Sequence, residues 1–390
     1  MSGRASGARA AAALLTAGLM AAGLALPVPV GAHAAGKPHR PPEVLLRSVG
    51  DSGVREADVR LRRADFHDTT DGADGERRTQ RLRTSSYRLA GLTWRGDGSS
   101  LMMRNRAGSG WSAWHPMPAL SDLPSADSPD ASATSGTEPL WVGGSDAVQI
   151  GLRGPIPQRL TLVLIDPGRR KSDSAEPEPT NRTGHHHWKH APRPPIRLRK
   201  AWGAVDSWRN GGPWYVRTIQ QVHIHHTVTA NRYSRADVPA LIRGMYRYHT
   251  HNLGWSDIGY NFLVDRFGRI WEGRKGGAGL PVQGAHTLGF NETSTGIAAI
   301  GNFELVKPSQ RMLTAIVRLA SWKLDKYHRD VPHWAHVFSH GSDRFRWGRT
   351  VVLPRIDGHR DTNQTACPGR RLYAKLPGIR RRATIRVRHY

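Results

Sequence analysis

The sequence predicts a mixed α/β domain, with a central β-sheet flanked by helices, preceded by a smaller all-β domain that we expect to be a sandwich. Strand-length apolar runs separated by Gly, Asp, Ser and Pro fill residues 40–167. Helix and strand signals alternate across residues 196–378. A charged, Pro-rich stretch without periodicity, residues 168–195, lies between them and is expected to be a linker.

The N-terminus has the order of a secretory signal peptide. Arg4 and Arg9 precede an apolar run of Ala, Leu and Gly, and the small residues around Ala34 follow that run. We therefore expect residues 1–34 to be removed and the protein to be secreted. No later run approaches the roughly 20 apolar residues that cross a bilayer, so no transmembrane segment is expected.

The chain is strongly basic, with a net charge of +26, so any polyanion will attract its surface at low salt. No helix-turn-helix, zinc-finger or aromatic RNA-binding signature accompanies the charge, and a specific nucleic-acid partner is not expected. In an exported protein, the basicity indicates retention by anionic wall polymers or solubility. The arginine-rich residues 379–390 are expected to be a solvated tail, and the protein is expected to be a monomer.

In the all-β domain, the clearest strands are residues 86–89, 140–142 and 160–165. Regular runs of this length between turn residues are typical of a sandwich. The prominent aromatics of the domain are Trp94, Trp111, Trp114 and Trp141. They could form a sugar-stacking face, but core or rim packing is the more frequent role of tryptophan.

The second domain opens with a strand over residues 219–227, in which His223 and His225 share one face and His226 points to the other. A capping box of Ser234 and Asp237 then begins a helix. Its apolar stripe ends at His249. The remaining elements are a hairpin over residues 260–272, a buried strand over 295–300 and a helix over 309–327.

Cys367 is the single cysteine of the chain, so in an exported protein it has no disulfide partner within the chain. His359 lies eight residues before it, and a strand-borne histidine cluster lies far upstream. A soft thiolate with imidazoles is a ligand set for zinc, and three protein ligands leave one position open. The spacing predicts a zinc site but leaves open whether His223 or His225 is the ligand.

A series of short motifs runs through residues 196–378, about half of the chain. Its members are Trp202-Gly203-Ala204, His225-His226-Thr227, Gly254-Trp255-Ser256-Asp257-Ile258-Gly259-Tyr260-Asn261-Phe262, Trp271-Glu272-Gly273-Arg274, Gly284-Ala285-His286-Thr287, Gly289-Phe290-Asn291, Gly296-Ile297, Ile300-Gly301-Asn302-Phe303, Gly358-His359-Arg360-Asp361 and Cys367-Pro368-Gly369. In content and order, the series resembles the peptidoglycan recognition protein family and the related phage-lysozyme-like type 2 N-acetylmuramoyl-L-alanine amidases.

This resemblance implies a zinc-dependent amide hydrolase. It implies zinc on His225, His359 and Cys367, and it favours His225 over His223. Tyr260 matches the catalytic tyrosine of the family, and Thr365 matches a second catalytic position. Family members without activity typically lack the cysteine ligand, which this chain retains.

The resemblance also implies the substrate, which is the stem peptide and muramic acid of peptidoglycan. Gly254, Trp255 and Arg274 match positions that accompany diaminopimelate-type stem peptides, and His249 and His286 match other substrate-binding positions. A guanidinium suits diaminopimelate because this residue carries an extra carboxylate, which arginine can grip in a bidentate manner. The alternatives are a peptidoglycan-binding protein without turnover and a basic wall protein that binds polyanions.

Overall fold

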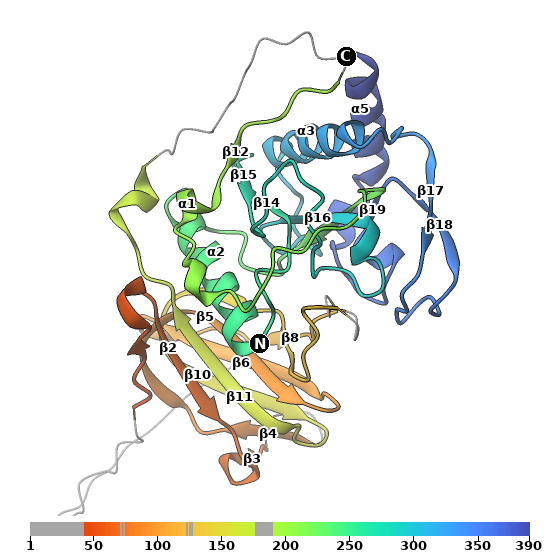
Figure 1. The fold of residues 1–390 in the computed structure, drawn as a ribbon. Helices are drawn as coiled ribbons and strands as arrows, with labels where there is room; N and C mark the ends of the chain where they lie inside the picture. The colour runs from red at the N-terminus through yellow and green to blue at the C-terminus, as the bar shows by residue number, and fades with distance from the viewer. Residues whose placement is uncertain (1–42, 71, 73–74, 122–123, 125–127, 176–189) are drawn as a thin grey trace, which may run out of the picture. The chain divides into compact units, whose positions relative to one another are not determined.

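The computed structural model describes residues 43–70, 72, 75–121, 124, 128–175 and 190–390 (Figure 1). The expected signal peptide, residues 1–34, lies outside the described residues. Residues 41–390 cluster into one compact unit. Within the described part of the chain, no helix combines the length and the apolar character that crossing a membrane requires.

The first domain contains only strands and short 3-10 turns among its described residues. Its strands are β1 (Arg47–Ser48), β2 (Arg55–Arg60), β3 (Phe66–Asp68), β4 (Glu76–Thr79), β5 (Leu82–Arg95), β6 (Ser100–Ala107), β7 (Gly110–Trp111), β8 (His115–Met117), β9 (Ser135–Gly136), β10 (Leu140–Arg153) and β11 (Gln158–Asp166). The prediction of an all-β domain is therefore confirmed.

These strands form one antiparallel sheet that folds over a single core. β5 pairs with β10 through its first half and with β11 through its second half. Met103 of β6 and Leu162 of β11 belong to the same buried cluster, although their strands do not pair. Two layers of one sheet thus face each other, as in a sandwich. Trp94 and Trp141 are buried, whereas Trp111 and Trp114 lie half-buried beside Arg104.

The second domain is mixed α/β. Its strands are β12 (Ile196–Arg197), β13 (Gln221–His226), β14 (Phe262–Val264), β15 (Ile270–Glu272), β16 (Ser294–Ala299), β17 (Trp334–Phe338), β18 (Thr350–Pro354) and β19 (Ile356–Gly358). Its helices are α1 (Arg199–Trp202), α2 (Asp237–Arg247), α3 (Gln310–Lys326), α4 (Arg370–Tyr373) and α5 (Leu376–Arg388). The central sheet has the order β12-β15-β14-β16-β13-β19, with only β14 and β15 antiparallel.

The two faces of the central sheet have different covers. Val222 and Ile224 of β13 belong to the apolar cluster that includes α3 and α5. Ala298 of β16 belongs instead to the cluster that includes α2. Because side chains alternate along a strand, His223 and His225 lie on the face opposite α3, as the strand pattern predicts.

Both predicted long helices form, and their starts follow from local chemistry. The Asp237 carboxylate accepts hydrogen bonds from the backbone N–H and the hydroxyl of Ser234 before α2. The Ser309 hydroxyl accepts from the Met312 N–H at the start of α3.

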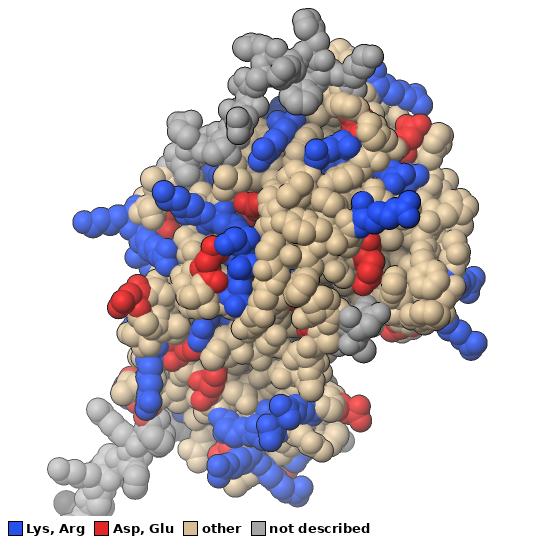
Figure 2. Space-filling view, viewed as in Figure 1, with Lys and Arg blue, Asp and Glu red and all other residues tan. Residues whose placement is uncertain are grey.

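The prediction of a solvated basic tail is wrong, because residues 376–388 form helix α5. Leu376, Ile379 and Ala383 are buried against the core that includes α3. Their spacing of three and four residues is a helical stripe, which the surrounding arginines hide in the sequence. In the view of Figure 2, Lys and Arg side chains are spread over the surface with acidic side chains between them.

The expected linker also differs from the structure in its first part. Residues 171–174 form a 3-10 turn, and Asp173 is buried against Arg243 of α2. The two domains share apolar packing as well, since Leu89 lies in one buried cluster with Leu241 and Met245. Residues 185–187, a run of three histidines in the expected linker, lie outside the described residues.

Lys323 of α3 is a buried cation whose titration should appear in the stability of the fold. Its Nζ donates to the carbonyls of Ala278 and Leu280, at 3.2 and 3.0 Å, and the side chain is 1% exposed. Burial lowers the pKa of Lys323 to about 7. The unfolded chain therefore binds more protons between pH 7 and about 10, and stability rises with pH across that window.

We expect the free energy of unfolding of the wild type to rise by about 2 kcal/mol relative to Lys323→Met between pH 7 and pH 9. Below pH 7, both states of the wild type are protonated, so the difference between the two proteins should level off. Chemical unfolding of both proteins at four pH values measures this difference. A difference in the free energy of unfolding that stays constant across these pH values would contradict the prediction.

Candidate metal centre and groove

The three predicted zinc ligands come together at one end of the central sheet. His225 is the penultimate residue of β13, and His359 follows β19, which pairs in parallel with β13 through Ile224 and Gly358. Cys367 lies in the loop that follows the 3-10 turn of His359–Asp361. The ligand atoms of the three residues lie within 4.8 Å of one another, and the Cys367 Sγ is 3.7 Å from the His225 Nδ1.

The chemistry of this group fits a zinc ion. A soft thiolate and two imidazoles are donors that suit the borderline-soft zinc ion, and all three side chains are buried. Among the described residues, this is the single group of three or more His, Cys, Asp or Glu with ligand atoms this close. His225, His359 and Cys367 can therefore hold a metal ion and leave a coordination position open.

His286 is buried beside the candidate ligands. Its Nδ1 lies 3.1 Å from the Nε2 of His225, so the two rings can share a hydrogen bond that orients His225. A Cβ at Gly284 or Gly296 would approach the His286 ring to 2.3 or 2.5 Å, so both glycines are needed for its position. The resemblance assigns His286 to the substrate, but the geometry favours a supporting role for the candidate metal ligand.

His223 belongs to a different pair on the same face. Its Nδ1 contacts the carboxylate of Asp357, and both side chains are completely buried. Burial raises the pKa of Asp357 to about 6, while the neighbouring His223 opposes this shift. With His223 engaged in this way, His225 is the member of the histidine cluster that joins His359 and Cys367.

Tyr260 and His249 line the next part of the site. The Tyr260 ring centroid lies 5.6 Å from that of His225 and 6.0 Å from that of His249. His249 sits in a π-helical turn after α2, and its Nδ1 accepts from the Gly259 N–H at 3.1 Å. Trp255 packs against His249 with ring centroids 4.6 Å apart. Gly254 has a φ of +79°, a conformation that favours glycine.

Thr365 lies beside the candidate metal ligand Cys367. Its Oγ1 accepts from the Cys367 N–H at 3.1 Å and lies 2.9 Å from the hydroxyl of Ser121 in the first domain. The first domain thus contributes a residue at this side of the site, which the sequence did not predict.

Arg274 is already occupied by other groups of the chain. Its Nη2 donates to Asp130 and to the Ser256 hydroxyl, at 2.5 and 2.7 Å, and its Nη1 donates to the Gln283 carbonyl. Arg274 is 4% exposed. The expectation of an open guanidinium that grips a substrate carboxylate therefore differs from the arrangement in the structure.

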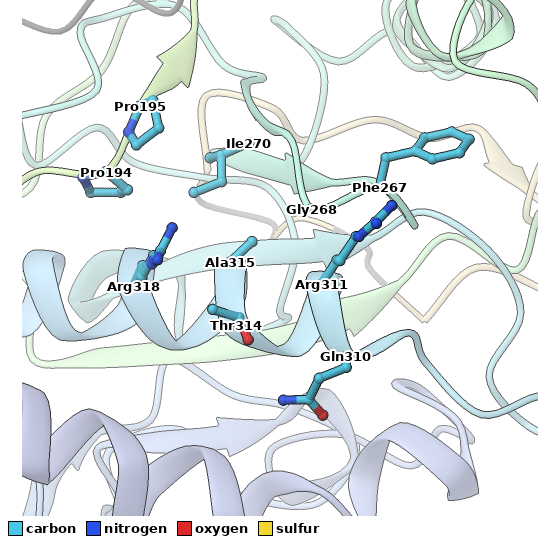
Figure 3. A pocket seen from close by; sticks show the side chains of 10 residues that line it. All are labelled: Pro194, Pro195, Phe267, Gly268, Ile270, Gln310, Arg311, Thr314, Ala315 and Arg318. Atoms are coloured by element: carbon cyan, nitrogen blue, oxygen red, sulfur yellow. The ribbon is translucent and has the colours of Figure 1, made fainter.

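Two cavities of the protein can be compared with the positions of the predicted site residues. One, of about 480 Å³, is lined by Trp255 and Leu288 together with Pro124 and residues 131–135 of the first domain. A second, of about 300 Å³, lies between α3, the turn after β14 and residues 194–195 (Figure 3). No predicted site residue lines the second cavity. The first cavity is lined by Trp255 and therefore adjoins the predicted substrate-binding residues.

Comparison with known proteins identifies the family. Residues 215–370 match the family model described as N-acetylmuramoyl-L-alanine amidase. The chain is 31% identical to the peptidoglycan recognition protein of Trichoplusia ni over 175 residues, which cover 44% of this chain and 82% of that protein. It is 40% identical to peptidoglycan-recognition protein SA of Drosophila melanogaster over 122 residues, which cover 31% of this chain and 57% of that protein.

Among solved structures, bumblebee PGRP-SA matches with a TM-score of 0.38 and 30% identity, covering 47% of this chain and 94% of that chain. The similarity to the Trichoplusia protein extends over most of its length, so the chain belongs to the peptidoglycan recognition protein and type 2 amidase family. The predicted family is thus confirmed. Residues 51–185 match a model described as Rv3811 N-terminal galactose-binding domain-like, which agrees with an all-β first domain.

Proposed function

We propose that this protein is a secreted, zinc-dependent N-acetylmuramoyl-L-alanine amidase that cleaves the bond between the lactyl group of muramic acid and L-alanine. The observation that carries the proposal is the convergence of His225, His359 and Cys367 within 4.8 Å in a chain of the amidase family. The retained Cys367 favours turnover over recognition, because three protein ligands with one open position are typical of catalytic zinc sites, whereas structural zinc sites are usually closed by four protein ligands.

The residues around the candidate ligands suit amide hydrolysis. A bound zinc ion would supply Lewis-acid polarisation of the scissile carbonyl and acidify a water molecule. Tyr260, next to His225, would donate a hydrogen bond to the oxygen that gains negative charge, a contribution worth about 10²–10³ in rate in comparable sites. Thr365, which already holds the Cys367 N–H, would orient substrate beside the ligand.

The substrate proposed is diaminopimelate-type peptidoglycan. Gly254, Trp255 and Arg274 support this choice through their match to the family positions, although Arg274 itself is paired with Asp130. The rings of Trp255 and His249 pack against each other at a tilt near Tyr260. The basic surface would hold the secreted protein near anionic wall polymers at low salt.

A second candidate is a peptidoglycan-binding protein without turnover. The observation that favours it is that the curated relatives are named as recognition proteins. In that case, zinc would serve structure alone.

Digestion of purified diaminopimelate-type peptidoglycan, followed by mass analysis of the products, separates the two candidates. We expect free stem peptides that begin with L-alanine, and we expect their release to stop on chelation and to resume with added Zn²⁺. Binding that persists without any released peptide would contradict the amidase and leave the recognition protein. Release of stem peptides that continues at the same rate after chelation would contradict the metal dependence.

A further inference from the structure

The first domain places a carboxylate of its own on the arginine expected to bind diaminopimelate. The Asp130 Oδ1 accepts from the Arg274 Nη2 at 2.5 Å, from the Ser256 N–H at 2.7 Å and from the Ser256 hydroxyl at 2.6 Å. Three donors from the second domain thus converge on a single carboxylate oxygen. Without Asp130, these three donors would be available to bind an anionic group of a ligand.

The ion pair is almost completely removed from water. The side chains of Asp130 and Arg274 are 1% and 3% exposed. In such a place, the attraction between the two charges is much stronger than at a surface, and removal of one partner leaves the other uncompensated. The charge of Arg274 is therefore neutralised within the chain, and the guanidinium offers no net charge to a substrate.

Local contacts hold Asp130 in this position. The hydroxyl of Ser128 accepts from the Asp130 N–H at 3.2 Å, and the Ser128 carbonyl accepts from the Ala131 N–H at 2.9 Å. Ser132, two residues further on, lies close to Gly254, because a Cβ at Gly254 would be 3.5 Å from the Ser132 hydroxyl. Asp130 is thus part of an ordered turn rather than a chance contact.

Among the residues that the structure describes, the lining of the cavity of about 480 Å³ is uncharged. Its residues are Pro124, Ala131, Ser132, Ala133, Thr134, Ser135, Trp255 and Leu288. The indole N–H of Trp255 is buried and has no hydrogen-bond partner among the described residues. An uncharged group with a hydrogen-bond acceptor would satisfy this donor.

We propose that Asp130 is a specificity-determining residue, which makes the enzyme select stem peptides whose diaminopimelate carries a carboxamide in place of its extra carboxylate. This inference rests on the proposed function. A free carboxylate would lose its water and approach Asp130, and the neighbouring cation, Arg274, is already paired with Asp130. A carboxamide avoids that repulsion, and its oxygen can accept from an N–H such as that of Trp255.

The test uses two muramyl peptides that differ only in this carboxylate or carboxamide. For the full-length protein, we expect kcat/KM to be at least about tenfold higher for the carboxamide. Asp130→Asn should lower this preference at least about tenfold, because the buried charge of Arg274 then attracts the free carboxylate. In Asp130→Asn with Arg274→Met both charges are gone. A free carboxylate would then again lose its water without a compensating charge, so the preference for the carboxamide should return.

Thermal unfolding and zinc content of each variant report whether it is folded. Dissociation constants of the same two peptides, measured by calorimetry, should show the same preference. A wild type that binds both peptides but hydrolyses neither would overturn the proposed function alone, and the ratio of its dissociation constants would still test Asp130. An unchanged ratio in Asp130→Asn would overturn the inference. An equal rise of kcat/KM for both peptides in Asp130→Asn would also overturn it, since Asp130 would then only hinder the access of both peptides to the site.

Discussion

Replacement of Cys367 by Ser is expected to remove zinc from the purified protein and to lower kcat/KM on diaminopimelate-type peptidoglycan by at least about a thousandfold. The hydroxyl is a weaker donor than the thiolate, and only His225 and His359 would remain. Loss of Lewis-acid stabilisation amounts to several kcal/mol, and each 1.36 kcal/mol is tenfold in rate. Metal analysis of the dialysed protein and release of stem peptide measure the two effects.

His226→Asn is the matched control for this experiment. His226 neighbours the ligand His225, but its Nδ1 accepts from the Phe303 N–H on the other face of β13, which an asparagine oxygen can also do. We expect this variant to keep its zinc and its activity. If Cys367→Ser retained one zinc per chain and full hydrolysis, the assignment of the third ligand would be wrong.

The local patterns of the second domain could be predicted from the sequence. Alternation along β13 separates His223 and His225 from His226, and the caps at Ser234 and Ser309 mark α2 and α3. The choice between His223 and His225 could not be made from spacing, because both share one face. It depends on Asp357, which follows 134 residues later and engages His223.

Contacts between the domains could not be predicted. Asp130 and Arg274 lie 144 residues apart. No periodic pattern around either residue indicates that the two side chains are in contact. The same holds for Ser121 and Thr365, which are 244 residues apart. In the expected linker, charged and Pro-rich composition indicated a flexible segment, yet Asp173 is held by a partner that lies 70 residues further along.

The buried ion pair of Asp173 and Arg243 is expected to contribute strongly to the stability of the protein. Replacement of Asp173 by Ala should lower the free energy of unfolding by about 3–5 kcal/mol, the usual cost of leaving one member of a buried pair alone. The Arg243 side chain is completely buried, and its two Nη atoms donate to the two oxygens of Asp173 at 2.8 and 2.7 Å. Chemical unfolding followed by tryptophan fluorescence measures the loss.

The remaining donors explain why the arginine cannot adapt. Its Nε, Nη1 and Nη2 also donate to the carbonyls of Pro167, Trp202 and Gly168, so its head group is fixed by backbone from both domains. A control at the neighbouring exposed Lys171, changed to Ala, should alter stability by less than about 0.5 kcal/mol. Asp173→Leu with Arg243→Met should recover part of the loss, because an apolar pair leaves no buried charge. A loss below about 1 kcal/mol in Asp173→Ala would mean that water reaches Arg243, and that residues 168–175 act as the linker the sequence predicted.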